Sequence, residues 1–201
     1  MFNPSYKYTF PPELYISQKP YLEVVRSTKR LGLVLSDNLK WTSNTDFIIF
    51  KAMKRIWTLR ILRKLGFGDQ FILDVYFKEV RVMLEYAVQI WNGALTQRDC
   101  DRIEKVQKIV LKFLWQNKYT SYTDACKFYK LPKLAVRRKS LCLRFAQKEL
   151  KKLNGLFQRL QNSNLRKVAK KKLVIQPESR TQRHFSSGFS YLARILNGSH
   201  N

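Results

Sequence analysis

The sequence contains few of the residues from which metal and catalytic centres are built. It has three cysteines, two histidines and only 14 acidic residues among 201. Cys100, Cys126 and Cys142 lie far apart and form no Cys-x-x-Cys pair, and only His184 and His200 could join them as metal ligands. This spacing excludes a disulfide framework and a zinc knuckle. Buried thiols in a reducing compartment are the simplest interpretation of the three cysteines.

Adjacent acidic residues and a glycine-rich phosphate loop are also missing. A two-metal polymerase or nuclease centre would have to be assembled from scattered single carboxylates, because no two acids are neighbours. Asp99 and Asp101 flank Cys100 at a predicted helix start, where the helix dipole explains them. A Cys/His nucleophile pair stays open, although His184 falls in a predicted loop. We therefore expect no autonomous enzymatic activity, no metal and no cofactor.

Long apolar runs are absent as well. No stretch approaches the roughly 20 apolar residues that a membrane-spanning helix needs, and the polar, aromatic start MFNPSYKYTF has no signal-peptide core. Membrane association through a basic helix is the least favoured alternative, since no helix near the C-terminus has a clear lipid-facing side. We expect an intracellular protein, nuclear or cytoplasmic, without membrane attachment.

Positive charge is what the sequence has in excess. It contains 39 Lys and Arg against 14 Asp and Glu, a net charge of +25. From Ala125 onward there are 19 Lys and Arg and two acids, so +17 of that charge lies in the last part of the chain. Such a balance indicates a polyanionic partner, and we expect RNA, an RNA/DNA hybrid or DNA.

The first 43 residues favour extended structure. Prolines at positions 4, 11, 12 and 20 exclude a helix there, and short strands are predicted at 13–17 and 22–27. Alternating residues predict a further strand over Leu31–Leu35. Ser36-Asp37-Asn38 supplies turn residues, and Leu39 and Trp41 form the apolar return of a hairpin.

Helical periodicity dominates the rest of the chain. The first helix is predicted from Asn44 or Thr45 to a C-cap at Gly66. A second covers Asp69–Trp91, and a third is opened by a capping box of Thr96 and Asp99. The predictions after these are a short helix capped by Ser121 and Asp124, a long basic helix over 134–153, and a terminal amphipathic segment, 189–197, that docks back through Phe189, Leu192, Ile195 and Leu196.

These elements predict a mainly α fold. A short N-terminal β-hairpin is followed by a three-helix bundle joined by short turns, and then by a basic helical C-terminal extension. The predicted segments are 1–43 for the hairpin part, 44–117 for the bundle, 118–157 for the basic extension and 158–201 for a basic, partly disordered tail with a short terminal helix.

Two basic faces are candidates for nucleic-acid binding, because Lys and Arg at helical spacing form a strip that can follow a phosphate backbone. The bland alternative is that any single Lys or Arg on an outer helix face is simply solvated. The first face comprises Lys51, Lys54, Arg55, Arg60, Arg63 and Lys64. The second comprises Arg137, Arg138, Lys139, Arg144, Lys148, Lys151 and Lys152, continued by Lys170, Lys171 and Lys172.

The order of motifs resembles the C-terminal part of reverse transcriptases from non-LTR retrotransposons of the LINE, jockey-like type. Residues 28–66 resemble the family's Leu-Gly-Val hairpin, its Leu-x-Trp and the helix after it. Residues 74–114 resemble its Tyr…Arg…Leu-Glu-Tyr-Ala…Trp…Ile-Glu-x-Val-Gln pattern, and residues 121–148 its tail. The matching residues of the last two stretches are Tyr76, Arg81, Leu84, Glu85, Tyr86, Ala87, Trp91, Leu95, Ile103, Glu104, Val106, Gln107, Lys108, Arg137, Arg138, Leu141, Cys142, Phe145 and Ala146.

The resemblance implies a role in gripping primer and template. Residues Leu31, Gly32, Leu33 and Trp41 would belong to a primer grip at the end of the palm, and 44–115 to the thumb. The family's fingers, most of its palm and its (Phe/Tyr)-x-Asp-Asp metal site are not in this sequence, so its polymerase activity does not transfer to this chain alone. The missing palm and fingers are thereby an expected partner.

Two other interpretations stay open. In one, the chain is a domesticated or free-standing interaction module in which Phe50, Trp57 and Ile61, once packed on the palm, contact a new partner. In the other, it is a non-functional truncated copy of the element, which would expose apolar surface and fold poorly. The preferred hypothesis is a nucleic-acid-binding C-terminal fragment without its own catalytic centre.

Overall fold

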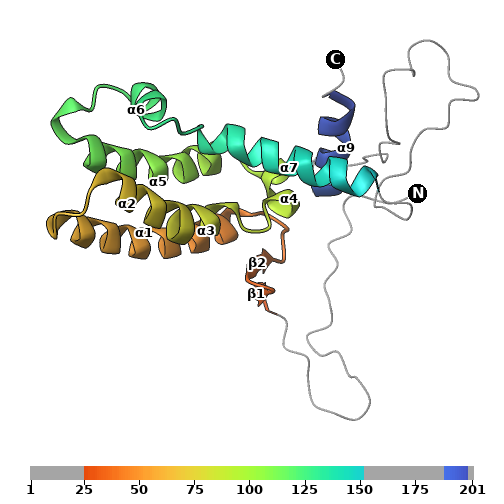
Figure 1. Cartoon of the computed structure of the whole chain (residues 1–201). Helices are drawn as coiled ribbons and strands as arrows, with labels where there is room; N and C mark the ends of the chain where they lie inside the picture. The colour runs from red at the N-terminus through yellow and green to blue at the C-terminus, as the bar shows by residue number, and fades with distance from the viewer. Residues whose placement is uncertain (1–24, 152–187, 199–201) are drawn as a thin grey trace, which may run out of the picture.

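The computed structural model describes residues 25–151 and 188–198 (Figure 1). Consecutive long helices run in opposite directions, and α7 extends beyond the bundle to reach α9. The mainly helical class with a short N-terminal hairpin is confirmed. The elements are β1 (Ser27–Arg30), β2 (Leu33–Ser36), α1 (Thr42–Lys64), α2 (Asp69–Val75), the π-helical turn η1 (Tyr76–Arg81), α3 (Val82–Glu85), α4 (Val88–Trp91), η2 (Asn92–Ala94), α5 (Gln97–Trp115), η3 (Gln116–Lys118), α6 (Tyr122–Phe128), α7 (Leu134–Leu150) and α9 (Gly188–Gly198).

The hairpin turns earlier than predicted. β1 and β2 pair antiparallel with Arg30 opposite Leu33, so Leu31 and Gly32 form a two-residue turn. Both have positive φ, 47° and 81°, as in a type I′ turn. The predicted strand over Leu31–Leu35 is therefore wrong in its first two residues. The predicted turn at 36–38 is present, because Leu39 N–H donates to Ser36 O at 2.9 Å, but it leads into α1 and not into a return strand.

The first helix begins at Thr42, before the predicted cap residues. Asn44 is fully buried, and its Oδ1 accepts from Val34 N–H at 3.1 Å, which fastens β2 to α1. Its side chain is therefore committed to the hairpin and does not cap the helix. The predicted C-cap is confirmed: Gly66 has φ 86°, and Phe67 N–H reaches back to Leu62 O at 3.2 Å.

The predicted second helix is broken. After α2 the backbone widens into η1. α3 ends at Glu85, and the next residue, Tyr86, has a ψ of 128° and is followed by a φ of 49° at Ala87. Five of its buried residues, Ile72, Tyr76, Val80, Leu84 and Val88, are spaced four residues apart. In a regular α-helix this spacing would drift about 160° around the axis over 16 residues. The π turn and the break absorb that drift and keep one face toward α1.

Both predicted capping pairs are confirmed. Thr96 Oγ1 accepts from Asp99 N–H at 3.1 Å, and Ser121 Oγ accepts from Asp124 N–H at 3.1 Å. Asp99 is buried, and its carboxylate also accepts from Thr42 Oγ1 at 3.1 Å. The start of α5 is thereby linked to the start of α1.

The terminal helix α9 packs against α4, η2 and α7, which agrees with the predicted docking. Leu192, Ala193 and Leu196 are buried, whereas Phe189 is exposed. A Cβ at Gly93 would lie 2.4 Å from Tyr191 Cβ, so the two backbones meet where only glycine fits.

Several predictions fall outside the described residues. They are the strand at 13–17, the first half of the strand at 22–27, the last residues of the basic helix, and the tail between 158 and 187. In the described half of 22–27 the strand prediction is wrong at Val25 and Arg26, because β1 begins only at Ser27. Within the described part of the chain, no helix is long and apolar enough to cross a membrane.

Gly93→Ala is expected to detach α9, because the added methyl group would overlap Tyr191, and such overpacking costs about 1–3 kcal/mol. Hydrogen exchange of the α9 amides should rise while exchange in α5 stays unchanged. Gly198→Ala is the control, since nothing lies within 4 Å of a Cβ there. Unchanged protection of α9 in Gly93→Ala would contradict this close approach.

Candidate nucleic-acid interface

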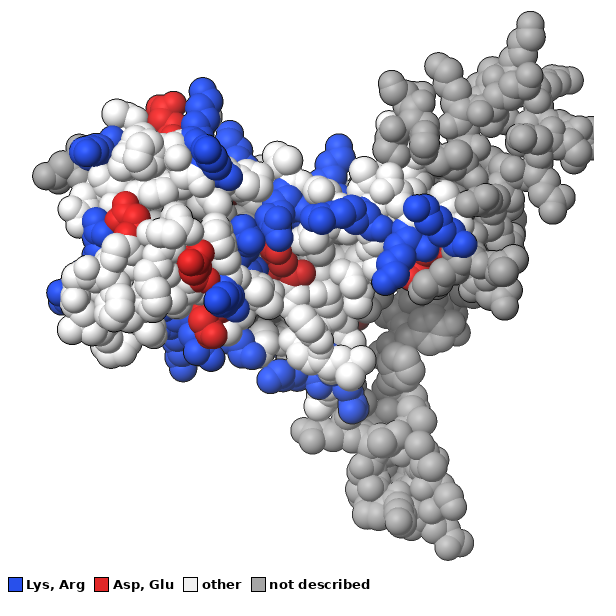
Figure 2. Space-filling view, viewed as in Figure 1, with Lys and Arg blue, Asp and Glu red and all other residues white. Residues whose placement is uncertain are grey.

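One side of α7 carries a continuous basic stripe. At 100° per residue, its members fall within about 60° of one another and extend over about 27 Å of helix. Four of the five side chains are exposed and Arg137 is half-buried. Figure 2 shows Lys and Arg gathered along α7 with few acids between them. We call this set the α7 stripe: Lys133, Arg137, Arg144, Lys148 and Lys151.

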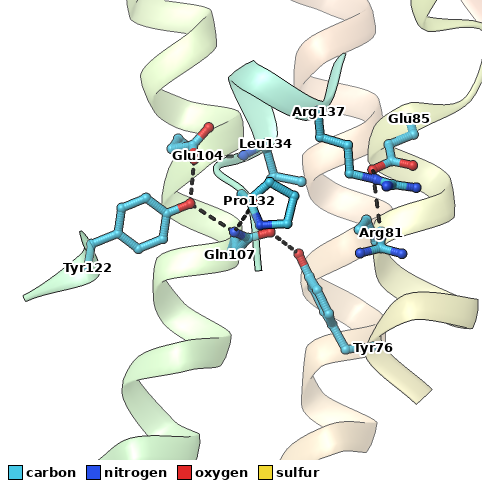
Figure 3. Close-up of polar contacts among 9 residues, drawn as sticks. All are labelled: Tyr76, Arg81, Glu85, Glu104, Gln107, Tyr122, Pro132, Leu134 and Arg137. Carbon is cyan, nitrogen blue, oxygen red and sulfur yellow. Dashed lines mark hydrogen bonds and ion pairs between the residues drawn. The ribbon is translucent and has the colours of Figure 1, made fainter. Parts of the chain in front are cut away.

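Glu104 of α5 fixes the start of α7. Its Oε1 accepts from Leu134 N–H at 2.9 Å, and its Oε2 accepts from Ala135 N–H at 3.0 Å (Figure 3). Lys133, which precedes the helix, makes no side-chain cap. A carboxylate at this position satisfies two free backbone donors and complements the positive end of the helix dipole.

A buried glutamine connects this cap to the bundle. Gln107 Oε1 accepts from Tyr76 Oη–H at 2.8 Å, and its Nε2 donates to Tyr122 Oη at 3.0 Å and to Pro132 O at 3.1 Å. Tyr122 in turn donates its proton to Glu104. Burial raises the pKa of Tyr76 and, together with Glu104, that of Tyr122. Both phenols therefore stay protonated donors at every physiological pH.

A second contact holds α7 one turn later. Arg137 Nε donates to Glu85 Oε1 of α3, and Arg81 Nε lies 3.7 Å from the same oxygen. Figure 3 shows Arg81 and Arg137 approaching Glu85 from different helices. The ion pair orients Arg137 at the edge of the α7 stripe.

Apart from Arg137 and Arg138, the predicted residues of the second basic face fall into three groups. Arg144, Lys148 and Lys151 are exposed in the α7 stripe. Lys139 is exposed too, but it lies roughly 140° around the helix from the stripe. Lys152, Lys170, Lys171 and Lys172 lie outside the described residues.

The expectation that Arg138 faces outward is wrong. Its side chain is 1% exposed, and its Nε donates to Asn92 Oδ1 at 3.1 Å. Asn92 Nδ2 donates to Tyr191 Oη at 3.0 Å, so Arg138 belongs to the seam between α7, η2 and α9. It sits between Leu134 and Cys142 on the inner side of α7, where its Nε has Asn92 as a partner while its Nη1 is buried without a hydrogen-bond partner.

The predicted α1 residues do not form one face. Lys51 and Arg55 lie on one side of α1. Lys51 lies over the Phe47 ring, 4.5 Å from its centroid, and Arg55 pairs with Glu79 at 3.0 Å. Arg60 and Lys64 lie on another stripe that continues from exposed Phe50, Met53 and Trp57. Lys54 contacts the Phe50 ring at 4.4 Å, and Arg63 is paired with Asp69 and donates to Leu114 O at 3.4 Å.

The residues of the predicted primer grip lie in different environments. Leu31 is 90% exposed at the hairpin tip, whereas Leu33 is buried and Trp41 is partly buried against the core. Tyr86 Oη–H donates to Leu31 O at 2.9 Å, and a Cβ at Gly32 would lie 3.3 Å from the Tyr86 ring. The hairpin tip is thus held against the break between α3 and α4.

The described residues include three cysteines with free thiols, Cys100, Cys126 and Cys142. They contain no group of three or more His, Cys, Asp or Glu that could hold a metal ion. Burial raises the pKa of Cys100 and Cys126, and that of Cys142 to about 12. Thiols with raised pKa are protonated at neutral pH and are poor nucleophiles.

Lys133 was not among the predicted binding residues, and the contacts that position the stripe were not predicted. Lys133 could have been found, because it stands four residues before Arg137 and so shares its helix face. Glu104 and Gln107 belong to the family pattern noted in the sequence, but no local signal indicates their contacts, since their partners are 15 to 31 residues away.

The chain was compared with protein families, curated proteins and solved structures. No family model, curated protein or solved structure matches the chain. The resemblance to retrotransposon reverse transcriptases therefore remains a hypothesis that rests on the residue pattern.

Glu104→Ala is expected to lower the free energy of unfolding by roughly 2–4 kcal/mol, because two backbone donors and the Tyr122 hydroxyl lose a charged acceptor. Urea denaturation would measure the loss. Glu79→Ala removes a carboxylate from the exposed pair with Arg55 and should cost less than about 1 kcal/mol. Equal losses in the two variants would contradict a special role for Glu104.

Proposed function

We propose that this chain is the thumb and tail part of a non-LTR retrotransposon reverse transcriptase, and that it binds RNA, an RNA/DNA hybrid or DNA. The observation that carries the proposal is the α7 stripe, in which five cations share one side of a helix. The order of motifs from the hairpin to α7 supports the assignment to this family.

The α7 stripe suits a phosphate backbone for physical reasons. Neutralising phosphates with Lys and Arg releases condensed counterions, which drives binding without reading the base sequence. Five side chains spread over about 27 Å can contact several successive phosphates of an extended or helical strand. Because Glu104 and Glu85 fix α7 from two sides, the stripe is held in one orientation before ligand arrives.

Binding, and not catalysis, is the activity we assign to this chain alone. Its sequence contains no adjacent acidic pair of the kind that holds two metal ions in a polymerase. The palm and fingers of the parent polymerase would supply that chemistry, and the hairpin and α1 are the surfaces proposed to contact them. In this proposal the chain holds the primer and template.

Lys148→Glu is expected to weaken nucleic-acid binding roughly 3- to 10-fold near 0.15 M salt, because it replaces a phosphate contact with a repulsive charge. Lys139→Glu changes the net charge equally on the same helix but away from the stripe, and should weaken binding less than about twofold. Fluorescence anisotropy with a labelled RNA/DNA hybrid, repeated over a salt series, would compare them. A wild-type affinity that does not respond to salt would contradict the proposal.

A second candidate function is protein interaction through α1. Phe50 is 59% exposed and Trp57 66% exposed on one side of the helix, an arrangement more typical of an interface than of a solvated face. Ile61, included in the same predicted interface, is only partly exposed. This surface would contact either the palm or, in a domesticated protein, a new partner.

The double variant Phe50→Ser/Trp57→Ser separates the two functions. If α1 is an interface, it should abolish binding to a recombinant palm and fingers fragment of this polymerase family, because the apolar contact area is lost, and leave affinity for the hybrid within about twofold. Sedimentation velocity would measure the complex. Val136→Ser is the control, since Val136 is 61% exposed on α7. A parallel loss of nucleic-acid affinity would argue against a separate protein interface.

A further inference from the structure

Two guanidinium groups converge on one carboxylate oxygen beside the α7 stripe. Arg81 Nε lies 3.7 Å from Glu85 Oε1, and Arg137 Nε donates to the same atom (Figure 3). The side chain of Glu85 is 11% exposed, that of Arg81 18% and that of Arg137 27%. The carboxylate is thus the deepest of the three groups. An anion approaching from solvent meets the two guanidiniums first, and they retain one uncompensated positive charge.

Most donors of this cluster remain available to a ligand. A guanidinium has five N–H donors. Arg137 uses its Nε–H for Glu85, and Arg81 approaches Glu85 with its Nε at 3.7 Å without a hydrogen bond. In the described part of the chain, the terminal amino groups of Arg81 and Arg137 make no hydrogen bond to another residue. Arg81 is held from its other side by the Phe77 ring, 4.0 Å from its guanidinium carbon. Burial and the neighbouring Arg137 lower the pKa of Arg81, as expected of two cations that lack a second anion.

We propose that Arg81 and Arg137 form a clamp for a single phosphate group of the nucleic-acid backbone, with Glu85 as the positioning residue for both guanidiniums. The clamp rests on the proposed function, and it identifies one phosphate contact of the α7 stripe. A phosphodiester fits because its two non-bridging oxygens accept from two guanidinium forks at once. Arg144 and Lys148 lie further along the same side of α7, where the following phosphates would pass.

A shared phosphate has a signature that separate contacts lack. For a single strand, each lost phosphate contact makes the negative slope of log affinity against log salt shallower by about 0.7. Arg81→Gln and Arg137→Gln should each lose about that amount, and the double variant should lose no more than either single one, because one phosphate is lost in every case. Arg98→Gln removes the same charge from an exposed position and is the control.

Labelled single-stranded RNA, titrated by fluorescence anisotropy at several salt concentrations, provides the measurement. Circular dichroism and thermal unfolding identify variants that keep the wild-type fold. If Arg81→Gln unfolds, Arg81→Lys decides, because it keeps the charge and the stem over Phe77 but loses the fork. We expect it to bind RNA at least roughly twofold more weakly than Arg98→Lys does.

Glu85→Gln tests the positioning role through the sign of its effect. Removing a negative charge should tighten RNA binding if only net charge matters, whereas a clamp that loses its positioning group should bind more weakly. Additive slope losses, an Arg81→Gln variant that binds like Arg98→Gln, or tighter binding by Glu85→Gln would each overturn the clamp and leave the proposed function intact. Wild-type protein that does not bind RNA or the hybrid would overturn both.

Discussion

The placement of α7 depends on the carboxylate of Glu104. It takes two backbone N–H groups at the start of α7 and the hydroxyl of Tyr122, and so joins α5, α6 and α7 at one point. Gln107 extends this junction to Tyr76 in η1. α7 begins after Pro132 with Lys133 at its N-cap, and Lys133 makes no side-chain hydrogen bond that would cap the helix and fix its direction. The distant acid supplies that direction.

The same polar junction explains why the bundle tolerates the irregular helical segment made of α2, η1, α3 and α4. Tyr76 opens the π-helical turn, and its buried hydroxyl needs a partner, which Gln107 provides. Arg81 ends the π-helical turn and stands four residues before Glu85, on the same side of the helix, where Glu85 also pairs with Arg137. Irregular helical turns of this kind often occur at functional sites. Here the irregular turn lies next to the charged side chains of the proposed binding surface.

Local signals in the sequence predicted local structure well. The capping pairs at Thr96 and Ser121 and the glycine at 66 were located correctly, because each depends on neighbours within a few residues. Long-range contacts defeated the same reasoning. Asn44 was read as a cap but is held by β2, and Arg138 was read as solvent-facing but is enclosed by Asn92 and α9. The four-residue spacing from Ile72 to Val88 was a visible sign of the broken helix.

The few acids of this chain matter more by their position than by their number. Asp99 and Glu149 are buried, Glu85 is nearly so, and Glu104 faces the inside of the bundle. Each therefore lies beneath the surface that a ligand would meet. The exposed cations of the α7 stripe lie closer to solvent than these acids do. A polyanion approaching α7 encounters a field more positive than the net charge of the same residues implies, because the compensating charges are the ones furthest from it.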